Sequence, residues 1–367
     1  MNIKVSGNLL GRKIHNISNV YSKSSKNDYS SNIRFILYKD HIEIQAMNER
    51  VTVWEKIYDD LDIDLDDRSS FSFLIDASTF ISFIKNRYEY IDIRIKDNNE
   101  IDFVYSRGCF STTWSEDRAY PKFVLPVENN VLTLNSKLFV PLLKRSFYFS
   151  GKDEFRPFME TALIDISNGV FNLVTTDRFR LFKSSKNIDG IDDQKILLSE
   201  IVSSILYQYL VDDDVNINIS TDNTRTFIWF DDIIISDINV VNNFPNYNII
   251  FDRFEVSTAI ELNKKEFCSI IQSSSIIDDI YVYINICSKT IVKSEVLGTR
   301  NKFVEYIEPN SFYGEEVIVK VKKKDIISCI NNVVGDLLRM EYCSSMRNIR
   351  LFNPKYDNEL IVCSTYG

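Results

Sequence analysis

Residues 132–143 read LTLNSKLFVPLL, and two other stretches of the chain repeat this pattern. IKVSGNLLGRKI begins at residue 3 and IELNKKEFCSII begins at residue 260, so the three copies start at nearly equal intervals and align without gaps. In each copy apolar and polar residues alternate, a Ser or Asn follows, and apolar residues then recur with a helical period. Self-similarity at a fixed interval predicts a repeat architecture.

Each copy is typical of a strand that ends where a helix begins. Alternation gives the strand one buried face, and Ser6, Asn135 and Asn263 stand where an N-cap side chain accepts free helix N–H groups. A second strand–helix signal follows later in each repeat, at 73–84, 196–206 and 317–330.

Short alternating strands with DN, NN and DD turns fill the rest of each repeat. The sequence therefore predicts an α+β fold of three tandem units, each with two helices and two small antiparallel sheets. The expected boundaries lie near Pro126 and Asp252, which gives domains 1–126, 127–253 and 254–367.

Composition places the chain among folded proteins. It has 367 residues and is 44% hydrophobic, enough for two or three cores. No apolar run approaches the eighteen or so residues of a membrane helix, and the start, MNIKVSGNLLGRK, has no apolar signal-peptide core. We therefore expect a cytoplasmic protein.

Cysteine and histidine are too scattered to predict a metal site. The six cysteines form no CxxC pair, which favours reduced and mostly buried thiols. His15 and His41 are the only histidines, which argues against histidine-based catalysis and metal binding. The net charge of −9 argues against a uniformly DNA-binding surface, but only the local field of one face meets a ligand.

The middle repeat carries the most specific motifs. LNSKLFVPLLKRSFYFSGKDEFRPFMETALIDI at 134–166 is followed by LVTTDRFRLF at 173–182 and NNFPNYNII at 242–250. With CFSTTWSEDRAYPKF at 109–123, these stretches resemble the bacterial DNA polymerase III beta subunit, the sliding clamp. The resemblance covers essentially the whole chain and is weakest over the last hundred residues.

The resemblance implies three DNA-clamp domains in a chain that joins a second copy head to tail and encircles duplex DNA without reading its sequence. It implies a non-catalytic processivity factor that needs no cofactor. The implied partners are the polymerase III alpha subunit and clamp-loader subunits, each docking a short peptide motif in a hydrophobic groove between the second and third domains.

By the same resemblance, residues of four segments line the peptide groove. They are Met159, Thr176, Arg178, Phe179, Arg180, Leu181, Pro245, Ile249, Ile250, Val362, Cys363 and Ser364. The chain departs from the family pattern because Arg178 replaces a Gly, Phe179 replaces a His and Ile249 replaces an Arg. Val362, Cys363, Ser364 and Thr365 also replace the usual Met-Pro-Met-Arg, so the peptide preference is expected to differ.

A clamp contacts phosphates through Lys and Arg on the helices that line its hole. Helical spacing and position select Arg12, Lys13, Lys23, Lys26, Lys85, Arg87, Lys137, Lys144, Arg145, Lys264, Lys265, Lys322 and Lys323. The resemblance carries the dimer contacts over to Phe110 and Thr112 of the first unit and to Gln272 and Ser273 of the third.

Three other interpretations compete with a working clamp. DDLDIDLDD at 59–67 has carboxylates in calcium-loop spacing but lacks the Gly and Glu of an EF-hand, and it fits a strand with an acidic face better. An enzyme would need convergent acid, base or nucleophile groups, and no triad or P-loop motif occurs. A clamp-fold interaction scaffold that has lost DNA encirclement stays open as an alternative.

Overall fold

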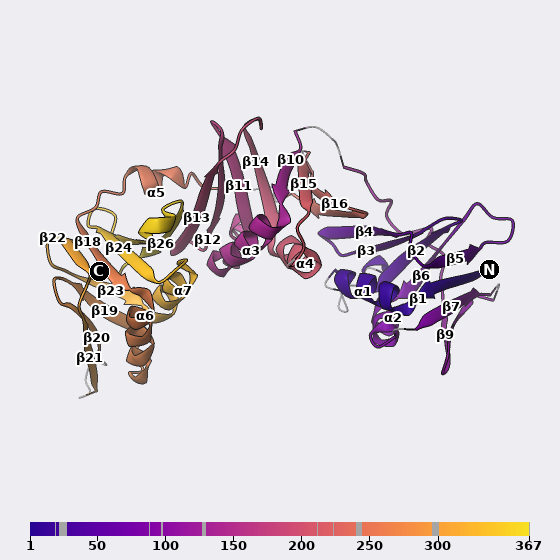
Figure 1. Cartoon of the computed structure of the whole chain (residues 1–367), viewed down its shortest axis with the longest axis horizontal. Helices are drawn as coiled ribbons and strands as arrows, with labels where there is room; N and C mark the ends of the chain where they lie inside the picture. The colour runs from indigo at the N-terminus through magenta and orange to yellow at the C-terminus, as the bar shows by residue number, and fades with distance from the viewer. Residues whose placement is uncertain are drawn as a thin grey trace. The chain divides into compact units, whose positions relative to one another are not determined.

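The computed structural model describes residues 1–18, 20–21, 28–87, 89–96, 98–126, 130–210, 212–222, 224–239, 244–295 and 301–366. Figure 1 shows the helices and strands of the chain, which folds into two compact units. Unit 1 consists of Met1–Lys144 and Leu198–Asn239, and unit 2 consists of Arg145–Leu197 and Val240–Gly367.

Unit 1 contains two antiparallel sheets. The five-stranded sheet has the order β5 (Leu61–Asp64), β1 (Asn2–Ser6), β7 (Tyr90–Ile95), β8 (Glu100–Tyr105) and β9 (Gly108–Thr113). The eight-stranded sheet has the order β10 (Leu132–Asn135), β15 (Asn216–Thr221), β16 (Arg225–Phe230), β17 (Ile233–Ile238), β4 (Val51–Ile57), β3 (Ile42–Met47), β2 (Asn32–Tyr38) and β6 (Ser70–Asp76).

Unit 2 is built in the same way. Its nine-stranded sheet has the order β14 (Gln194–Ser199), β11 (Thr161–Ser167), β12 (Val170–Thr176), β13 (Arg180–Asn187), β26 (Glu359–Ser364), β25 (Asn348–Phe352), β24 (Leu337–Cys343), β18 (Thr258–Asn263) and β22 (Ser311–Gly314). Its four-stranded sheet has the order β21 (Lys302–Ile307), β20 (Thr290–Glu295), β19 (Tyr281–Ile286) and β23 (Val317–Lys322).

Six helices each follow a strand directly, as the repeated pattern predicts. They are α1 (Gly7–Ile17), α2 (Ala77–Ile84), α3 (Ser136–Ser146), α4 (Glu200–Leu210), α6 (Lys264–Ser273) and α7 (Lys323–Asn332). A short helix, α5 (Asn248–Asp252), precedes β18. The predicted α+β fold is therefore confirmed.

Side-chain caps start several of these helices where the sequence places them. Ser6 accepts from the N–H of Leu9 at 3.4 Å, and Asn263 accepts from the N–H of Glu266 at 3.0 Å. These caps satisfy N–H groups that have no partner inside the helix. Asn135, also predicted as a cap, donates its side-chain amide to Asp214 at 2.6 Å.

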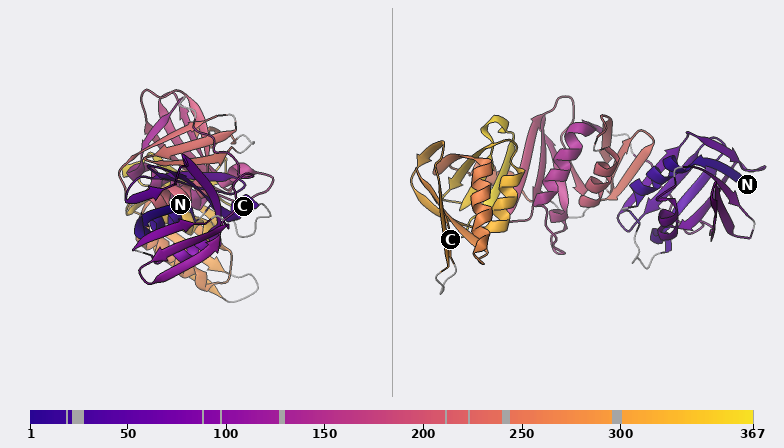
Figure 2. Two further views of the ribbon diagram at one scale, coloured as in Figure 1. Left: turned by 90° about the vertical axis from the view of Figure 1, so that its right-hand side faces the viewer. Right: turned by 60° about the horizontal axis from the view of Figure 1, so that its bottom comes forward.

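Helix pairs cover one face of the sheets in each unit. Leu10, Ile14 and Ile17 of α1 are buried at helical spacing, and α1 packs against both α2 and α4. In unit 2, α6 and α7 lie side by side (Figure 2). Among the described residues, no helix is long and apolar enough to cross a membrane.

Two strand ladders join segments of different predicted domains. β17 pairs with β4 in unit 1, and β13 pairs with β26 in unit 2. Each ladder fuses two of the predicted small sheets edge to edge, which explains why the two compact units do not follow the predicted boundaries near Pro126 and Asp252. The three-domain division stays a prediction.

The acidic stretch 59–67 forms the edge strand β5. Leu61 and Ile63 are half-buried, Asp62 and Asp64 are exposed, and Asp62 lies opposite Lys4 of β1. The strand interpretation is therefore confirmed. All six cysteines carry free thiols, and all but Cys109 are buried.

Candidate functional site

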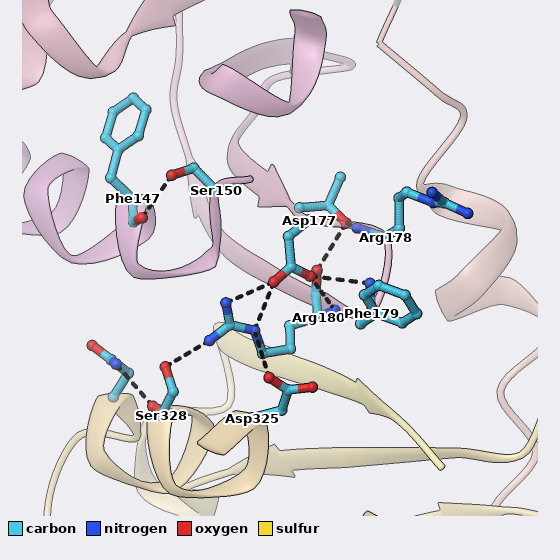
Figure 3. A network of polar contacts seen from close by, with 10 residues as sticks. Phe147, Ser150, Asp177, Arg178, Phe179, Arg180, Asp325 and Ser328 are labelled. Carbon is cyan, nitrogen blue, oxygen red and sulfur yellow. Dashed lines mark hydrogen bonds and ion pairs between the residues drawn. The ribbon is translucent and has the colours of Figure 1, made fainter. Parts of the chain in front are cut away.

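The turn between β12 and β13 is held by a dense set of hydrogen bonds (Figure 3). Asp177 Oδ1 accepts from the N–H groups of Phe179 at 3.0 Å and Arg180 at 2.7 Å. Thr176 Oγ1 accepts from the N–H of Arg178 at 3.1 Å and donates to the Arg180 carbonyl at 2.8 Å. Such side-chain bonds to nearby backbone groups fix a turn.

Arg180 ties this turn to α7. Its Nε and Nη2 donate to Asp177 Oδ2 at 2.8 and 2.6 Å, and its Nη1 donates to Ser328 Oγ at 2.8 Å. Asp325 Oδ1 lies 4.0 Å from Nε. Burial is the largest single effect and opposes the charge of Arg180, but Asp177 and other nearby groups, among them Asp325, together raise the pKa of the guanidinium. Arg180 is thus a positioning residue, because each of its three guanidinium nitrogens already donates to Asp177 or Ser328.

Arg178 occupies the left-handed region of backbone space, with a φ of +80°. Its side chain is exposed and points away from the Asp177–Arg180 network (Figure 3). This conformation strains a residue with a Cβ and suits glycine.

Replacing Arg178 by glycine is expected to stabilise unit 2 by about 0.5–1 kcal/mol, because the relief of backbone strain exceeds the entropy that glycine loses. The thermal unfolding midpoint measures this change. Arg178→Lys keeps the strain and serves as the matched control. An unchanged or lower midpoint for Arg178→Gly would contradict the assigned backbone conformation.

An apolar cluster lies beside the turn. Leu163, Val174, Leu181, Tyr247 and Val362 are its buried members. Leu197, Phe244, Ile250 and Phe251 pack against it and stay partly exposed. Apolar walls drawn from several elements are typical of a surface that binds a peptide.

Two polar groups fix the α5 segment on this cluster. The Tyr247 hydroxyl donates to Asp165 Oδ2 at 2.8 Å, and burial together with this carboxylate raises the pKa of Tyr247. The Lys183 ammonium lies 4.8 Å from the centroid of the Phe251 ring, and burial lowers the pKa of this lysine. The sequence motifs quoted for the groove included Phe244 and Tyr247, but their packing role was not predicted.

The structure brings the predicted groove residues together in unit 2, at different depths. Arg178, Phe179, Pro245 and Ile249 are exposed, whereas Arg180, Ile250 and Ser364 are half-buried. The buried members are Met159, Thr176, Leu181, Val362 and Cys363.

Cys363 is a wrong prediction for a surface contact. Successive side chains of a strand point to opposite faces, so Cys363 points away from the face of β26 that carries Val362 and Ser364. It is 1% exposed and interacts with the buried Cys329 of α7.

The predicted dimer contacts lie at sheet edges and at the end of a helix. Phe110 and Thr112 belong to β9, the outermost strand of its sheet, and the Phe110 ring stacks on Phe83 with centroids 4.6 Å apart. Gln272 and Ser273 are exposed at the end of α6. Ile276, which no sequence motif singled out, follows them and is 82% exposed.

No protein-family model matches the chain. Among curated proteins, it is 22% identical to the beta sliding clamp of Chlamydia muridarum, over 74% of this chain and 73% of that protein. It is 17% identical to the beta sliding clamp of Halalkalibacterium halodurans, over 79% of this chain and 78% of that protein.

Solved structures match over the whole chain. The DNA polymerase sliding clamp from Bacillus subtilis has a TM-score of 0.90 at 15% identity, covering 100% of this chain and 99% of that one. The DNA polymerase III beta chain from Streptococcus pneumoniae has a TM-score of 0.91 at 15% identity, with the same coverage. The chain has the sliding-clamp fold. The predicted resemblance is thus confirmed at the level of the fold.

Several of the predicted DNA-binding residues of this sliding-clamp fold have partners within the chain. Lys13 forms an ion pair with the buried Glu55, Arg145 pairs with Glu359 at 2.5 Å, and Lys265 pairs with Asp336 at 3.1 Å. Lys264 donates to the Val333 carbonyl at 2.7 Å. Arg87 lies over the Tyr105 ring, 4.3 Å from its centroid.

Lys323 is a wrong prediction for DNA binding. It is buried, and its ammonium donates to the carbonyls of Ser274 and Ile277, both at 2.9 Å. Lys322 lies over the rings of Phe179 and Tyr366. It therefore faces the candidate partner site, which we define as the groove residues Phe179, Pro245, Ile249 and Ile250 that reach the surface.

Four of the predicted basic residues, which lie on helices or directly after one, stay available to a ligand. Arg12, Lys85 and Lys137 are exposed, and Lys144 is half-buried with its ammonium 5.8 Å from the Tyr207 ring centroid. Lys23 and Lys26 lie outside the described residues. The described residues hold no group of three or more His, Cys, Asp or Glu arranged to bind a metal ion.

Proposed function

We propose that this chain is a DNA sliding clamp, a non-catalytic processivity factor of three tandem domains (1–126, 127–253 and 254–367). Two copies join head to tail and encircle duplex DNA, and the ring tethers a replicative polymerase. The sliding-clamp fold and the curated beta sliding clamps similar in sequence support this proposal.

The proposal rests on one kind of contact, edge-to-edge strand pairing between predicted domains, which occurs twice within the chain. β17 is the last strand of the second predicted domain and pairs with β4 of the first. In the same way, β26 is the last strand of the third and pairs with β13 of the second. β9 is the last strand of the first predicted domain, and β21 has the same position in the third domain as β4 in the first and β13 in the second. Both β9 and β21 are outermost strands of their sheets among the described residues.

An outermost strand presents unpaired backbone groups that pair readily with another chain. We infer that β9 of one copy pairs antiparallel with β21 of a second copy. Two such junctions close a ring by two-fold symmetry. The proposed flanks of each junction are Phe110, Thr112, Gln272, Ser273 and the exposed Ile276.

DNA binding in this proposal depends on phosphate contacts and reads no bases. Arg12, Lys85, Lys137 and Lys144 are the proposed contacts, because they are helix-borne or helix-flanking and are not used in an ion pair with a described residue. Partner proteins, proposed to be the polymerase alpha subunit and clamp-loader subunits, dock short peptides at Phe179, Pro245, Ile249 and Ile250.

Reversing the charge of three helix-associated residues in Arg12→Glu/Lys85→Glu/Lys137→Glu is expected to weaken duplex affinity at least about tenfold. The slope of log affinity against log salt should fall by about three, since each lost phosphate contact removes about 0.9. Titration of a labelled duplex at several salt concentrations measures both quantities.

The control variant is Lys122→Glu/Lys152→Glu/Lys195→Glu, because these exposed lysines lie off the helices and give the same change in net charge. Equal losses of affinity in the two triple variants would show that net charge, and not the helix residues, governs binding. That result would contradict the proposed DNA contacts.

A further inference from the structure

The outer face of the four-stranded sheet β21-β20-β19-β23 interleaves lysine with tyrosine. Tyr283 lies opposite Lys320 of β23 on one side and Lys293 of β20 on the other, and Tyr281 lies opposite Lys322. Directly opposed residues in antiparallel strands share a face. The alternate residues Val282, Ile284, Val319 and Val321 are buried on the inner face, so the lysines and tyrosines all face outward. We call this surface the Lys–Tyr face.

Aromatic rings hold the ammonium groups in place. The Lys320 ammonium lies 4.4 Å from the Tyr281 ring centroid and 5.7 Å from that of Tyr283. The Lys322 ammonium lies 4.7 Å from the Phe179 centroid and 5.1 Å from the Tyr366 centroid. Cation–π contacts restrict these flexible side chains, so a bound anion would cost little further side-chain entropy.

The Lys–Tyr face is continuous with the candidate partner site. Phe179, which Lys322 covers, is an exposed residue of the β12–β13 turn, and its carbonyl accepts from the N–H of Ser364 at 2.8 Å. Two residues later, Tyr366 donates its N–H to the Lys320 carbonyl at 2.8 Å. A peptide bound at Phe179 therefore reaches Lys320 and Lys322 with its neighbouring residues.

The positive charges on this surface are not neutralised within the part of unit 2 that the structure describes. None of Lys293, Lys320, Lys322 and Arg178 forms an ion pair with a described residue. Asp325 acts on Lys322 electrostatically but lies against Arg180. Glu295 lies at the end of β20, opposite Lys302 of β21. In a chain of net charge −9, this surface has a positive local field.

We infer that the Lys–Tyr face binds the carboxylates of acidic residues that flank the apolar anchors of a partner peptide. The inference rests on the proposed function, because it assumes that a peptide docks beside Phe179. Single-stranded nucleic acid fits less well, because bases stack on open aromatic faces and ammonium groups already cover the rings of Tyr281, Phe179 and Tyr366.

The test uses the full chain and three labelled peptides that share one Leu-Phe pair and carry Glu, Gln or Lys on both sides of it. Fluorescence anisotropy measures their affinities at low and high salt. The Glu peptide is expected to bind about fivefold more tightly than the Gln peptide at low salt, and the Lys peptide more weakly than both, because exposed charge pairs contribute modestly and are screened by salt.

The Glu preference should vanish in Lys293→Met/Lys320→Met and persist in Lys186→Met/Lys195→Met, a matched pair of lysine losses on β13 and β14. Ile249→Asn, at an exposed residue of the candidate partner site, should weaken the binding of all three peptides. Equal affinity of the Glu and Gln peptides for the unaltered chain, or a Glu preference that survives in Lys293→Met/Lys320→Met, would overturn the inference.

Two further results separate this inference from the proposed function. If the Gln peptide binds and Ile249→Asn abolishes its binding, the partner site stands even when Glu adds nothing. If no peptide binds, the partner site itself fails and this inference fails with it. A single-stranded oligo-dT that binds the unaltered chain but not Lys293→Met/Lys320→Met, with peptide affinities unchanged, would assign the face to nucleic acid and overturn the inference.

Discussion

Lys13→Met is expected to lower the free energy of unfolding of unit 1 by about 3–5 kcal/mol, because it leaves a buried carboxylate without its counter-charge. Glu55 lies on β4, and its side chain is 0% exposed. Lys13 of α1 pairs with Glu55 Oε1, and the Tyr209 hydroxyl of α4 donates to Oε2 at 2.8 Å. Glu55 thus joins strand β4 to helix α1 through Lys13 and to helix α4 through Tyr209.

The stability lost in Lys13→Met should depend on pH. Burial raises the pKa of Glu55, and Lys13, Tyr209 and Arg12 lower it. Because the folded pKa is above the unfolded one, the folded state binds more protons between the two values, so stability falls as pH rises through that window. Removing Lys13 raises the folded pKa further. The difference in free energy of unfolding between Lys13→Met and the parent chain is therefore expected to shrink as pH falls and to be largest at alkaline pH.

Arg12→Met is the matched control, since Arg12 is the exposed neighbour of Lys13 on the same helix. Its effect should stay within about 0.5 kcal/mol. Replacing both partners in Lys13→Met/Glu55→Met should recover most of the lost stability, because no unpaired charge stays buried. Urea unfolding measures all three variants, and a Lys13→Met loss no larger than that of Arg12→Met would refute the role assigned to the pair.

Ser111→Pro is expected to weaken self-association of the chain at least about 100-fold. The N–H of Trp114 donates to the carbonyl of Asn99 at 3.0 Å. Because ladder bonds alternate along an antiparallel strand, residues 112, 110 and 108 bond to β8, whereas the N–H groups of 113, 111 and 109 point outward. Proline at 111 removes one outward donor and leaves a partner carbonyl unsatisfied, a cost of about 3 kcal/mol.

Ser111→Ala is the control for this variant, because it loses the same hydroxyl bond to Asp102 but keeps the N–H. Equal thermal midpoints for the two variants would establish that β9 stays folded. Sedimentation equilibrium then gives the association constants. A Ser111→Pro chain that associates as tightly as Ser111→Ala would show that β9 does not pair across the junction.

Local sequence signals predicted the elements of this fold well. The strand-to-helix step is a change of hydrophobic period within about ten residues, so LTLNSKLFVPLL and its two copies carry it without tertiary context. The caps at Ser6 and Asn263 likewise depend on three-residue spacing. The merging of sheets through β17·β4 and β13·β26 was not predicted, because these partners lie far apart in the chain and leave no local pattern.

The availability of basic side chains could not be read from the sequence. Lys13 and Lys323 have the spacing of surface residues, yet each has a buried partner more than forty residues away. Arg12, adjacent to Lys13, stays exposed. The positive φ of Arg178, in contrast, agrees with the glycine that the family resemblance places at that position.

The solution mass measured by sedimentation equilibrium across a wide range of concentrations tests the central claim most directly. A ring of two chains predicts a mass of twice 42.8 kDa that persists on dilution. A mass of 42.8 kDa at every concentration would contradict closure of the ring through β9 and β21.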